Sequence, residues 1–253
     1  MPTVRAIHVS PVKSLRLTSV ERAEVTPAGL LGDRQLMLVD ADGRVADARR
    51  FGTLLQLEAR LDGDSLQLRM PDGGTIQQEL ALEGTDTIEF YGNHIAGRWV
   101  NGPVGPAISE LIGREVRLFR GDADCACLDA HPVSMLSASA VEQLAHQAGH
   151  EGDLDARRFR PSLLLDGCEP HAEDRWIGGR VQAGEAVLDV VKLDIRCALT
   201  TRNPATGERD ADTLRWIGEF RPRDDGEICF GVYADVVQTG AVSVGDPVTP
   251  IES

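Results

Sequence analysis

Positively charged side chains stand beside several predicted turns of a chain that is otherwise acidic. Lys13 and Ser14 follow a predicted strand, and Arg34 precedes another. The densest basic stretch is Arg157–Arg160, and Arg196 closes a later strand. If these side chains converge at strand ends, together with loop amides, they form an anion pocket, most naturally for a phosphate. The alternative is surface arginines paired with the abundant carboxylates, which the charges taken alone favour because exposed ion pairs are common.

Cys197 is the cysteine whose setting best fits chemistry. It directly follows Arg196, and a neighbouring guanidinium is expected to lower the pKa of a thiol. The thiolate can bind a soft metal or attack an electrophile. The alternative is a small hydrophobic side chain with a structural role.

The other cysteines are expected to be reduced thiols with structural roles: Cys125, Cys127, Cys168 and Cys229. An odd total of five in a chain of this length does not suggest a disulfide framework. Their spacing fits neither a structural zinc site nor an iron–sulfur cluster.

Standard catalytic machinery is missing from the sequence. It contains no glycine-rich phosphate loop, no dinucleotide fingerprint, no His-Glu-x-x-His and no Gly-x-Ser-x-Gly. The six histidines are scattered, and His131 before Pro132 is expected to be a loop histidine without a catalytic role.

The composition narrows the class of partner. The 253 residues include 26 basic and 40 acidic side chains, a formal net charge of −14. Such a surface repels phosphate backbones, so neither a nucleic acid nor an anionic membrane is expected as a partner. No apolar run reaches the roughly 18 residues of a membrane span, and no signal core follows the first residues. We therefore expect a cytoplasmic protein.

Arginine dominates the basic residues, since only Lys13 and Lys192 are lysine. A general bias toward arginine explains the imbalance. Under such a bias a retained lysine is of interest, because a compact ammonium and a planar guanidinium are not interchangeable at a tight site.

The elements that must position these side chains are mostly short strands. Alternating or apolar runs at 3–9, 20–26 and 35–40 are separated by turn signals. Asp-Gly pairs at 42, 62 and 72, and Gly92-Asn93, predict hairpins. Further strands are expected at 162–166, 180–193, 228–237 and 247–251.

Helices are expected only in the later part of the chain, over 103–112, from a Ser137 cap to about 148, and over 212–220. The sequence therefore predicts a mainly β protein with a few helices (α+β). We expect an N-terminal β-barrel-like unit at 1–100, packed intimately on a second β-barrel unit at 101–253.

Five segments together resemble the MOSC family, named for the C-terminal domain of molybdenum-cofactor sulfurases. At 196–207 the chain reads Arg-Cys-x-Leu-Thr-Thr-x-x-Pro-x-Thr-Gly. The other four segments, in order along the chain, are Ser10-Pro11-Val12-Lys13-Ser14, Gly32-Asp33-Arg34, Arg158-Phe159-Arg160-Pro161 and Val244-Gly245-Asp246-Pro247-Val248. The chain also resembles the amidoxime-reducing components and their bacterial relatives, and the resemblance covers nearly its whole length.

This resemblance implies a molybdenum cofactor (Mo-molybdopterin) and a set of residues that hold it. Cys197 would be the protein ligand to molybdenum. The positions that would bind the rest of the cofactor are Lys13, Ser14, Arg34, Ser139, Arg160, Ser162 and Arg196. With the resemblance, cofactor binding is favoured over scattered surface charge.

Two departures from the family pattern affect this expectation. Ser162 stands where the family usually has asparagine, so one hydrogen bond to the cofactor is shortened or lost. The family often reads Ser-Glu-Ala-Ser-Leu where this chain has Ala138 after Ser137 and Ala140 after Ser139. The acidic residue and the second hydroxyl of that segment are therefore absent.

The resemblance implies an enzyme that reduces N-oxygenated compounds: N-hydroxylated bases, amidoximes and hydroxylamines. Oxygen-atom transfer at the cysteine-ligated metal would reduce this small-molecule substrate, with electrons from a separate ferredoxin- or flavin-type donor. The alternative is a non-catalytic carrier of the cofactor or of sulfur, in which Cys197 holds a persulfide or binds the cofactor transiently. A third reading is a β scaffold that no longer binds the cofactor.

Overall fold

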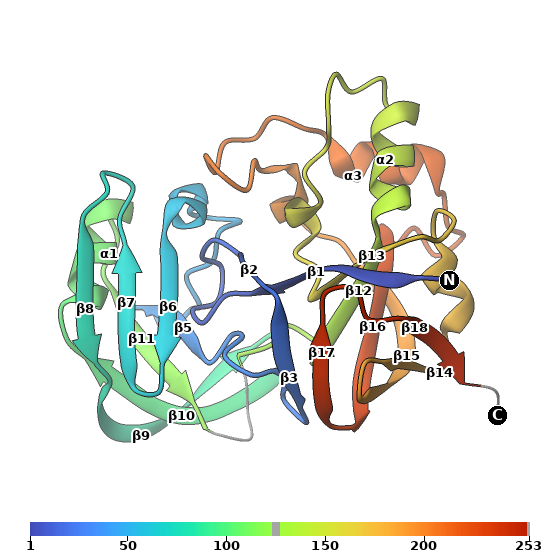
Figure 1. Cartoon of the computed structure of the whole chain (residues 1–253). Coiled ribbons are helices and arrows are strands. Elements are labelled where there is room, and N and C mark those ends of the chain that lie inside the picture. The colour runs from blue at the N-terminus through green and yellow to red at the C-terminus, as the bar shows by residue number, and fades with distance from the viewer. Residues whose placement is uncertain (123–126, 252–253) are drawn as a thin grey trace.

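The computed structural model describes residues 1–122 and 127–251, and these contain many strands but only three α-helices (Figure 1). The prediction of a mainly β protein with few helices is confirmed. Within the described residues the strands form four sheets, and each has an open strand order instead of closing into a barrel.

The largest sheet has eight strands in the order β18-β14-β15-β16-β12-β13-β1-β2. Their bounds are β1 (Thr3–Val9), β2 (Thr18–Val20), β12 (Val133–Ser137), β13 (Leu163–Asp166), β14 (Arg180–Ala183), β15 (Ala186–Ile195), β16 (Cys229–Gln238) and β18 (Val248–Ile251). Neighbours are antiparallel except β12 and β13, which run parallel. Alternating side chains such as Ile7, Leu163 and Val232 form its core.

Three smaller sheets complete the fold. One has the order β5-β11-β10-β9, the second β17-β3-β4 and the third β6-β7-β8. Their bounds are β3 (Arg22–Thr26), β4 (Gly29–Leu30), β5 (Leu36–Asp40), β6 (Glu58–Asp62), β7 (Ser65–Arg69), β8 (Thr75–Glu79), β9 (Ala81–Phe90), β10 (Asn93–Asn101), β11 (Val116–Gly121) and β17 (Gly240–Ser243). A second core, including Leu38, Leu66 and Ile108, lies among the first and third of these sheets and α1 (Val104–Ile112). Buried side chains of the sheet β17-β3-β4 belong to the core of the largest sheet.

The predicted helices are present. They are α1 (Val104–Ile112), α2 (Ala138–Gln147) and α3 (Thr213–Phe220), with short 3₁₀ helices η1 (Gly52–Gln56), η2 (Ala156–Phe159), η3 (Ala172–Trp176) and η4 (Ala198–Thr201). α1 ends at Gly113, whose φ of 65° supplies the left-handed cap. Ser137 precedes α2 as predicted, but its hydroxyl donates to Glu173 and does not cap the helix. None of the described helices is long and apolar enough to cross a membrane.

Two strand predictions and one turn prediction need correction. The segment 180–193 is the hairpin β14–β15, because Gly184 has a φ of 58° and turns the chain. The segment 20–26 is divided between β2 and β3. The turn between β9 and β10 is Tyr91-Gly92, one residue earlier than predicted, because these are the residues with positive φ.

Strands from the two ends of the chain are interleaved. β1 pairs with β13, and β3 pairs with β17, so N-terminal strands lie beside C-terminal ones (Figure 1). β11 in turn pairs with β5. The division into units 1–100 and 101–253 stays a prediction. Strands from one side of this boundary pair with strands from the other side, as β1 does with β13 and β5 with β11.

Candidate functional site

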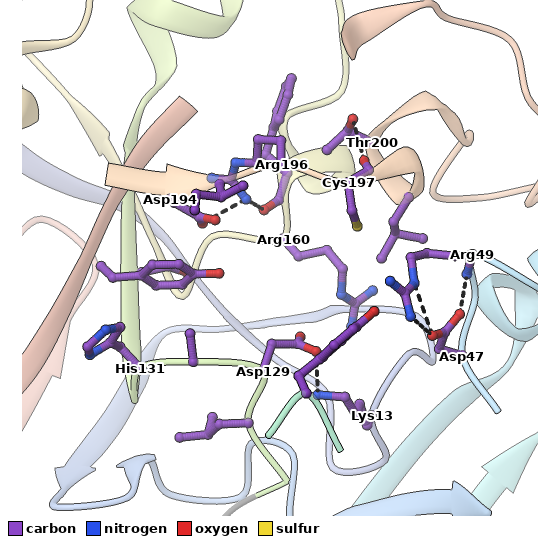
Figure 2. A pocket seen from close by; sticks show the side chains of 18 of the residues that line it. Lys13, Asp47, Arg49, Asp129, His131, Arg160, Asp194, Arg196, Cys197 and Thr200 are labelled. Atoms are coloured by element: carbon purple, nitrogen blue, oxygen red, sulfur yellow. Dashed lines mark hydrogen bonds and ion pairs between the residues drawn. The ribbon is translucent and has the colours of Figure 1, made fainter. Parts of the chain in front are cut away.

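A cavity of about 450 Å³ collects most of the residues singled out from the sequence (Figure 2). Six of the eight predicted site residues line it: Lys13, Ser14, Arg34, Arg160, Arg196 and Cys197. They come from loops far apart in the chain, since they follow β1, precede β5, follow η2 and connect β15 to η4. The loop ends of several sheets therefore meet at one place.

The lining of this cavity is cationic although the protein is strongly acidic. Seven lysine or arginine side chains line it against three aspartates. The cations are Lys13, Arg34, Arg49, Arg158, Arg160, Lys192 and Arg196, and the aspartates are Asp47, Asp129 and Asp194. Both lysines of the chain are among them. Such a concentration of positive charge suits an anionic ligand.

Strained backbone is concentrated in the same place. Among the described residues, five non-glycine residues have positive φ, and Ser14, Arg34, Tyr91 and Arg160 line the cavity, with φ between 46° and 72°. The fifth, His171, is not in the lining. Left-handed backbone is unfavourable for residues with a Cβ and persists where surrounding structure enforces it, often at functional sites.

Lys13 is buried and held from two directions. Its Nζ donates to the carbonyl of Cys127 at 2.7 Å and lies 3.1 Å from Asp129 Oδ1. Burial lowers the pKa of the Lys13 ammonium, although Asp129 opposes the shift. Burial alone would raise the pKa of the Asp129 carboxyl, but the charges of Lys13 and Arg34 hold it below its ordinary value. Two of the three ammonium donors are used, and the Phe90 ring centroid lies 4.8 Å from the same Nζ.

Each guanidinium nitrogen of Arg196 has a partner within the protein. Its Nε donates to the carbonyl of Phe230 at 2.7 Å, and Nη2 donates to the same oxygen. Its Nη1 lies 2.7 Å from both the carbonyl of Phe159 and Asp194 Oδ2. Asp194 is 3% exposed, and burial raises the pKa of its carboxyl to about 6, against the opposing charge of Arg196. This pair fixes the wall from which Cys197 projects.

Arg160 is in the opposite situation. Its Nη2 is buried and has no hydrogen-bond partner within residues 1–122 and 127–251. Burial lowers the pKa of its guanidinium to about 10, and the charge of Arg34 adds to that shift. Arg34 is paired with Asp33 at 2.5 Å, and Figure 2 shows the Arg160 side chain between Cys197 and the Lys13–Asp129 pair. A buried guanidinium nitrogen with an unused donor at a cavity is a ready site for an anion.

The Cys197 thiol is exposed, and Figure 2 shows it pointing into this space. The expectation that Arg196 lowers its pKa is wrong in its net direction. Partial burial by the surrounding walls raises the pKa of the Cys197 thiol, and the charges of Arg49 and Arg196 offset this only in part. The physical reason is that the cost of desolvating the thiolate outweighs the attraction of the two guanidinium charges.

The segment after Cys197 is fastened to the N-terminal part of the chain. Arg202 Nη2 donates to the carbonyl of Arg49 at 2.9 Å, and Gln56 Nε2 donates to that of Thr206 at 2.7 Å. Gly52 and Gly207 approach so closely that a Cβ on Gly207 would lie 2.0 Å from the Gly52 oxygen. The Asn-Pro-Ala-Thr-Gly turn therefore fixes where the cysteine loop sits.

Two predicted site residues lie outside the cavity lining. The Ser139 hydroxyl donates to the carbonyl of Cys168 at 2.9 Å. Ser162 is 1% exposed and exchanges hydrogen bonds with Ser134, which does line the cavity. Ser162 thus supports the wall from behind.

Several lining residues were missed from the sequence. The clearest are Asp47, Arg49, Tyr91, Asp129, Asp194 and Tyr233. Asp194 stands two residues before Arg196, which is the one local signal that could have suggested a pair. His131, expected to have no catalytic role, also lines the cavity and bonds Asp235 at 2.8 Å.

The remaining cysteines do not contribute to the cavity lining in the described residues. Cys168 and Cys229 are free thiols, as expected, and Cys125 lies outside the described residues. In residues 1–122 and 127–251, no group of three histidine, cysteine or acidic side chains is placed to hold a metal ion.

Comparison with known families and proteins gives consistent matches. Residues 122–249 match the MOSC domain, and residues 1–114 match the MOSC N-terminal beta barrel domain. Mitochondrial amidoxime-reducing component 1 from Xenopus laevis is 30% identical, over 97% of this chain and 81% of that protein. The human protein of the same name is 27% identical, over 97% of this chain and 82% of that protein. Among solved structures, the YUAD protein from Bacillus subtilis is 13% identical with a TM-score of 0.44, covering 98% of this chain and 94% of that one, too weak a likeness to carry an argument.

Proposed function

This chain belongs to the MOSC domain family, and on that basis we propose that it is a molybdenum-cofactor-dependent reductase of N-oxygenated compounds. Its substrates would be amidoximes, hydroxylamines and N-hydroxylated bases, in keeping with the names of its relatives. A separate ferredoxin- or flavin-type protein would supply the electrons.

The observation that carries this proposal is the pairing of two unusual groups in one cavity. Cys197 presents an exposed thiol, and Arg160 presents a buried guanidinium nitrogen that has no hydrogen-bond partner among the described residues. A thiolate is a soft ligand suited to molybdenum, and a guanidinium suits a phosphate. The donors present therefore fit the two ends of a molybdopterin cofactor.

The other residues of the cavity have assignable roles in this proposal. Arg160 and Lys13 would bind the terminal phosphate, with Arg34 adding positive charge. Each guanidinium nitrogen of Arg196 already has a protein partner, so Arg196 would position the Cys197 loop and would not itself bind the phosphate. Ser14 would add a hydroxyl at the phosphate, whereas Ser139 and Ser162 would act on the walls from outside.

When bound, the cofactor supplies the two-electron oxygen-atom transfer that converts the N-oxygenated substrate to the reduced base. The protein's own task is to hold it and to manage protons beside it. Asp194, with a carboxyl pKa of about 6, and the neighbouring Tyr233 hydroxyl lie in the wall of the same cavity. Burial raises the pKa of Tyr233, so its hydroxyl keeps its proton and can donate a hydrogen bond.

The first test is the molybdenum-to-protein ratio and the pterin content of the wild-type and Cys197→Ala proteins, purified from a host that makes the cofactor. We expect near-stoichiometric molybdenum and pterin in the wild type and loss of molybdenum in the variant. Cys168→Ala is the matched control, because this partly exposed thiol lies outside the cavity. Wild-type protein with neither molybdenum nor pterin would overturn the cofactor assignment.

Turnover separates the enzyme from the carrier. With a reconstituted electron chain, the wild type should reduce benzamidoxime, Cys168→Ala should match it, and Cys197→Ala should show no activity. Loaded wild-type protein without steady-state turnover would leave the non-catalytic carrier as the better description.

A further inference from the structure

One aromatic side chain reaches the cavity from the N-terminal part of the chain. Tyr91 lines the cavity and is 56% exposed. Of the large apolar or aromatic side chains that are exposed in the described residues, only Tyr91 and Ile195 line this cavity. Exposed apolar side chains at a cavity mouth mark a surface that a ligand covers.

The backbone at Tyr91 is unusual for such a residue. Tyr91 and Gly92 form the two-residue turn between β9 and β10, with φ of 51° and 78°. Hairpin turns with two positive φ values favour asparagine, aspartate or glycine at the first position, because a larger side chain is strained there. The sequence therefore keeps a tyrosine where hairpin formation alone would favour another residue.

The ring is also held in place. The Arg49 guanidinium lies over it at 4.9 Å, and the Phe90 ring centroid is 4.3 Å away. Arg49 is itself paired with Asp47. Asn93, next to the turn, donates to the backbone carbonyl of Asp129 at 3.3 Å, which ties the hairpin tip to the cavity loop. Tyr91 is thus a positioned wall of the cavity.

We propose that Tyr91 is a specificity-determining residue that stacks on planar, conjugated N-oxygenated substrates. The site would then prefer aromatic amidoximes to hydroxylamine. An aromatic amidoxime offers a flat π surface that can stack on the phenol ring, whereas hydroxylamine has none. Ile195, two residues before Cys197, supplies a second apolar contact at the mouth. This inference rests on the proposed reductase function.

The test compares two substitutions. Tyr91→Asn removes the ring and places at the turn a residue that favours positive φ, so the hairpin should fold at least as well. Tyr91→Phe retains the ring. Two readouts are used: calorimetric binding of benzamidoxime to cofactor-free protein, and kcat/KM for benzamidoxime and hydroxylamine with the loaded enzyme.

We expect Tyr91→Asn to weaken benzamidoxime binding and to lower its kcat/KM by about tenfold, through KM. Its kcat/KM for hydroxylamine should stay within about twofold, and Tyr91→Phe should resemble the wild type. Equal losses for both substrates, or a wild type that does not bind benzamidoxime, would overturn the role of Tyr91. If the wild type binds benzamidoxime through Tyr91 but turns over neither substrate, the binding wall stands and the reductase proposal fails.

Discussion

Two arginines face the same cavity, and the protein treats their charges in opposite ways. Arg196 is met by Asp194 and by two backbone carbonyls, so each of its guanidinium nitrogens has a partner before any ligand arrives. Arg160 lies beside another cation, Arg34, and has a buried nitrogen without a hydrogen-bond partner in the part of the chain that the structure describes. A cation that the fold has already neutralised is part of the architecture. One left with excess charge is available to an outside anion.

Removing the satisfied arginine should have the largest effect on stability. Arg196→Ala removes the cationic partner of the buried Asp194 carboxylate and the donor to two backbone carbonyls, which costs about 3–5 kcal/mol in free energy of unfolding. Urea denaturation of cofactor-free protein measures this. Arg196→Lys should rescue little, because the donors of a compact ammonium diverge from one atom and do not reproduce the planar spread of the guanidinium nitrogens. A loss below about 1 kcal/mol would erase the distinction between the two arginines.

Asp194, the acidic partner of Arg196, should make the next largest contribution to the free energy of unfolding, and this contribution depends on pH. Burial raises the pKa of the Asp194 carboxyl from 3.8 to about 6. Between these values the folded protein holds a proton that the unfolded chain has lost. Stabilisation by this group is therefore complete below about pH 4 and is lost as pH rises through about 6.

The comparison with Asp194→Asn isolates that contribution, because asparagine does not titrate. The unfolding free energy of the wild type minus that of the variant should fall by about 3 kcal/mol between pH 4 and pH 7. Denaturation of both proteins at several pH values checks this. A difference that is independent of pH would mean that Arg196 neutralises the carboxylate fully.

Removing the unsatisfied arginine should have the smallest effect on stability. Arg160→Met deletes a guanidinium whose buried Nη2 has no hydrogen-bond partner among the described residues, so cofactor-free protein should be unchanged or about 1 kcal/mol more stable. Inorganic phosphate should raise the Tm of the wild type but not of this variant, and pterin content should drop. Destabilisation by more than about 2 kcal/mol would show that Arg160 serves the fold as Arg196 does.

The elements were predictable where their signals are local. Gly113 ended α1 as expected, and the Asp-Gly pair at 62 and 63 joins β6 to β7. The turn at Gly184 was missed because the residues on both sides of it favour strand, and the single glycine did not stand out from them. That β1 pairs with β13, about 160 positions away, depends on tertiary packing that no local pattern encodes.

The site residues also fall into those that a local sequence signal reveals and those that only the tertiary structure reveals. Lys13, Arg34 and Arg160 stood out because positive charge beside turns is visible in a sequence. Asp194 and Asp129 did not, since a carboxylate in an acidic chain gains meaning only from its burial and its partner. Burial likewise decided the net direction of the Cys197 pKa shift against the charge of Arg196, and sequence adjacency does not reveal burial.

Because lysine is scarce, an amine-selective reagent can label this protein at very few positions. Apart from the N-terminus, its primary amines are those of Lys13 and Lys192, and both line the cavity. Lys13 is buried, whereas Lys192 is exposed. An amine-selective dye would therefore attach at the cavity rim and, beyond that, only at the N-terminus. The label at the rim can report directly on what enters and leaves.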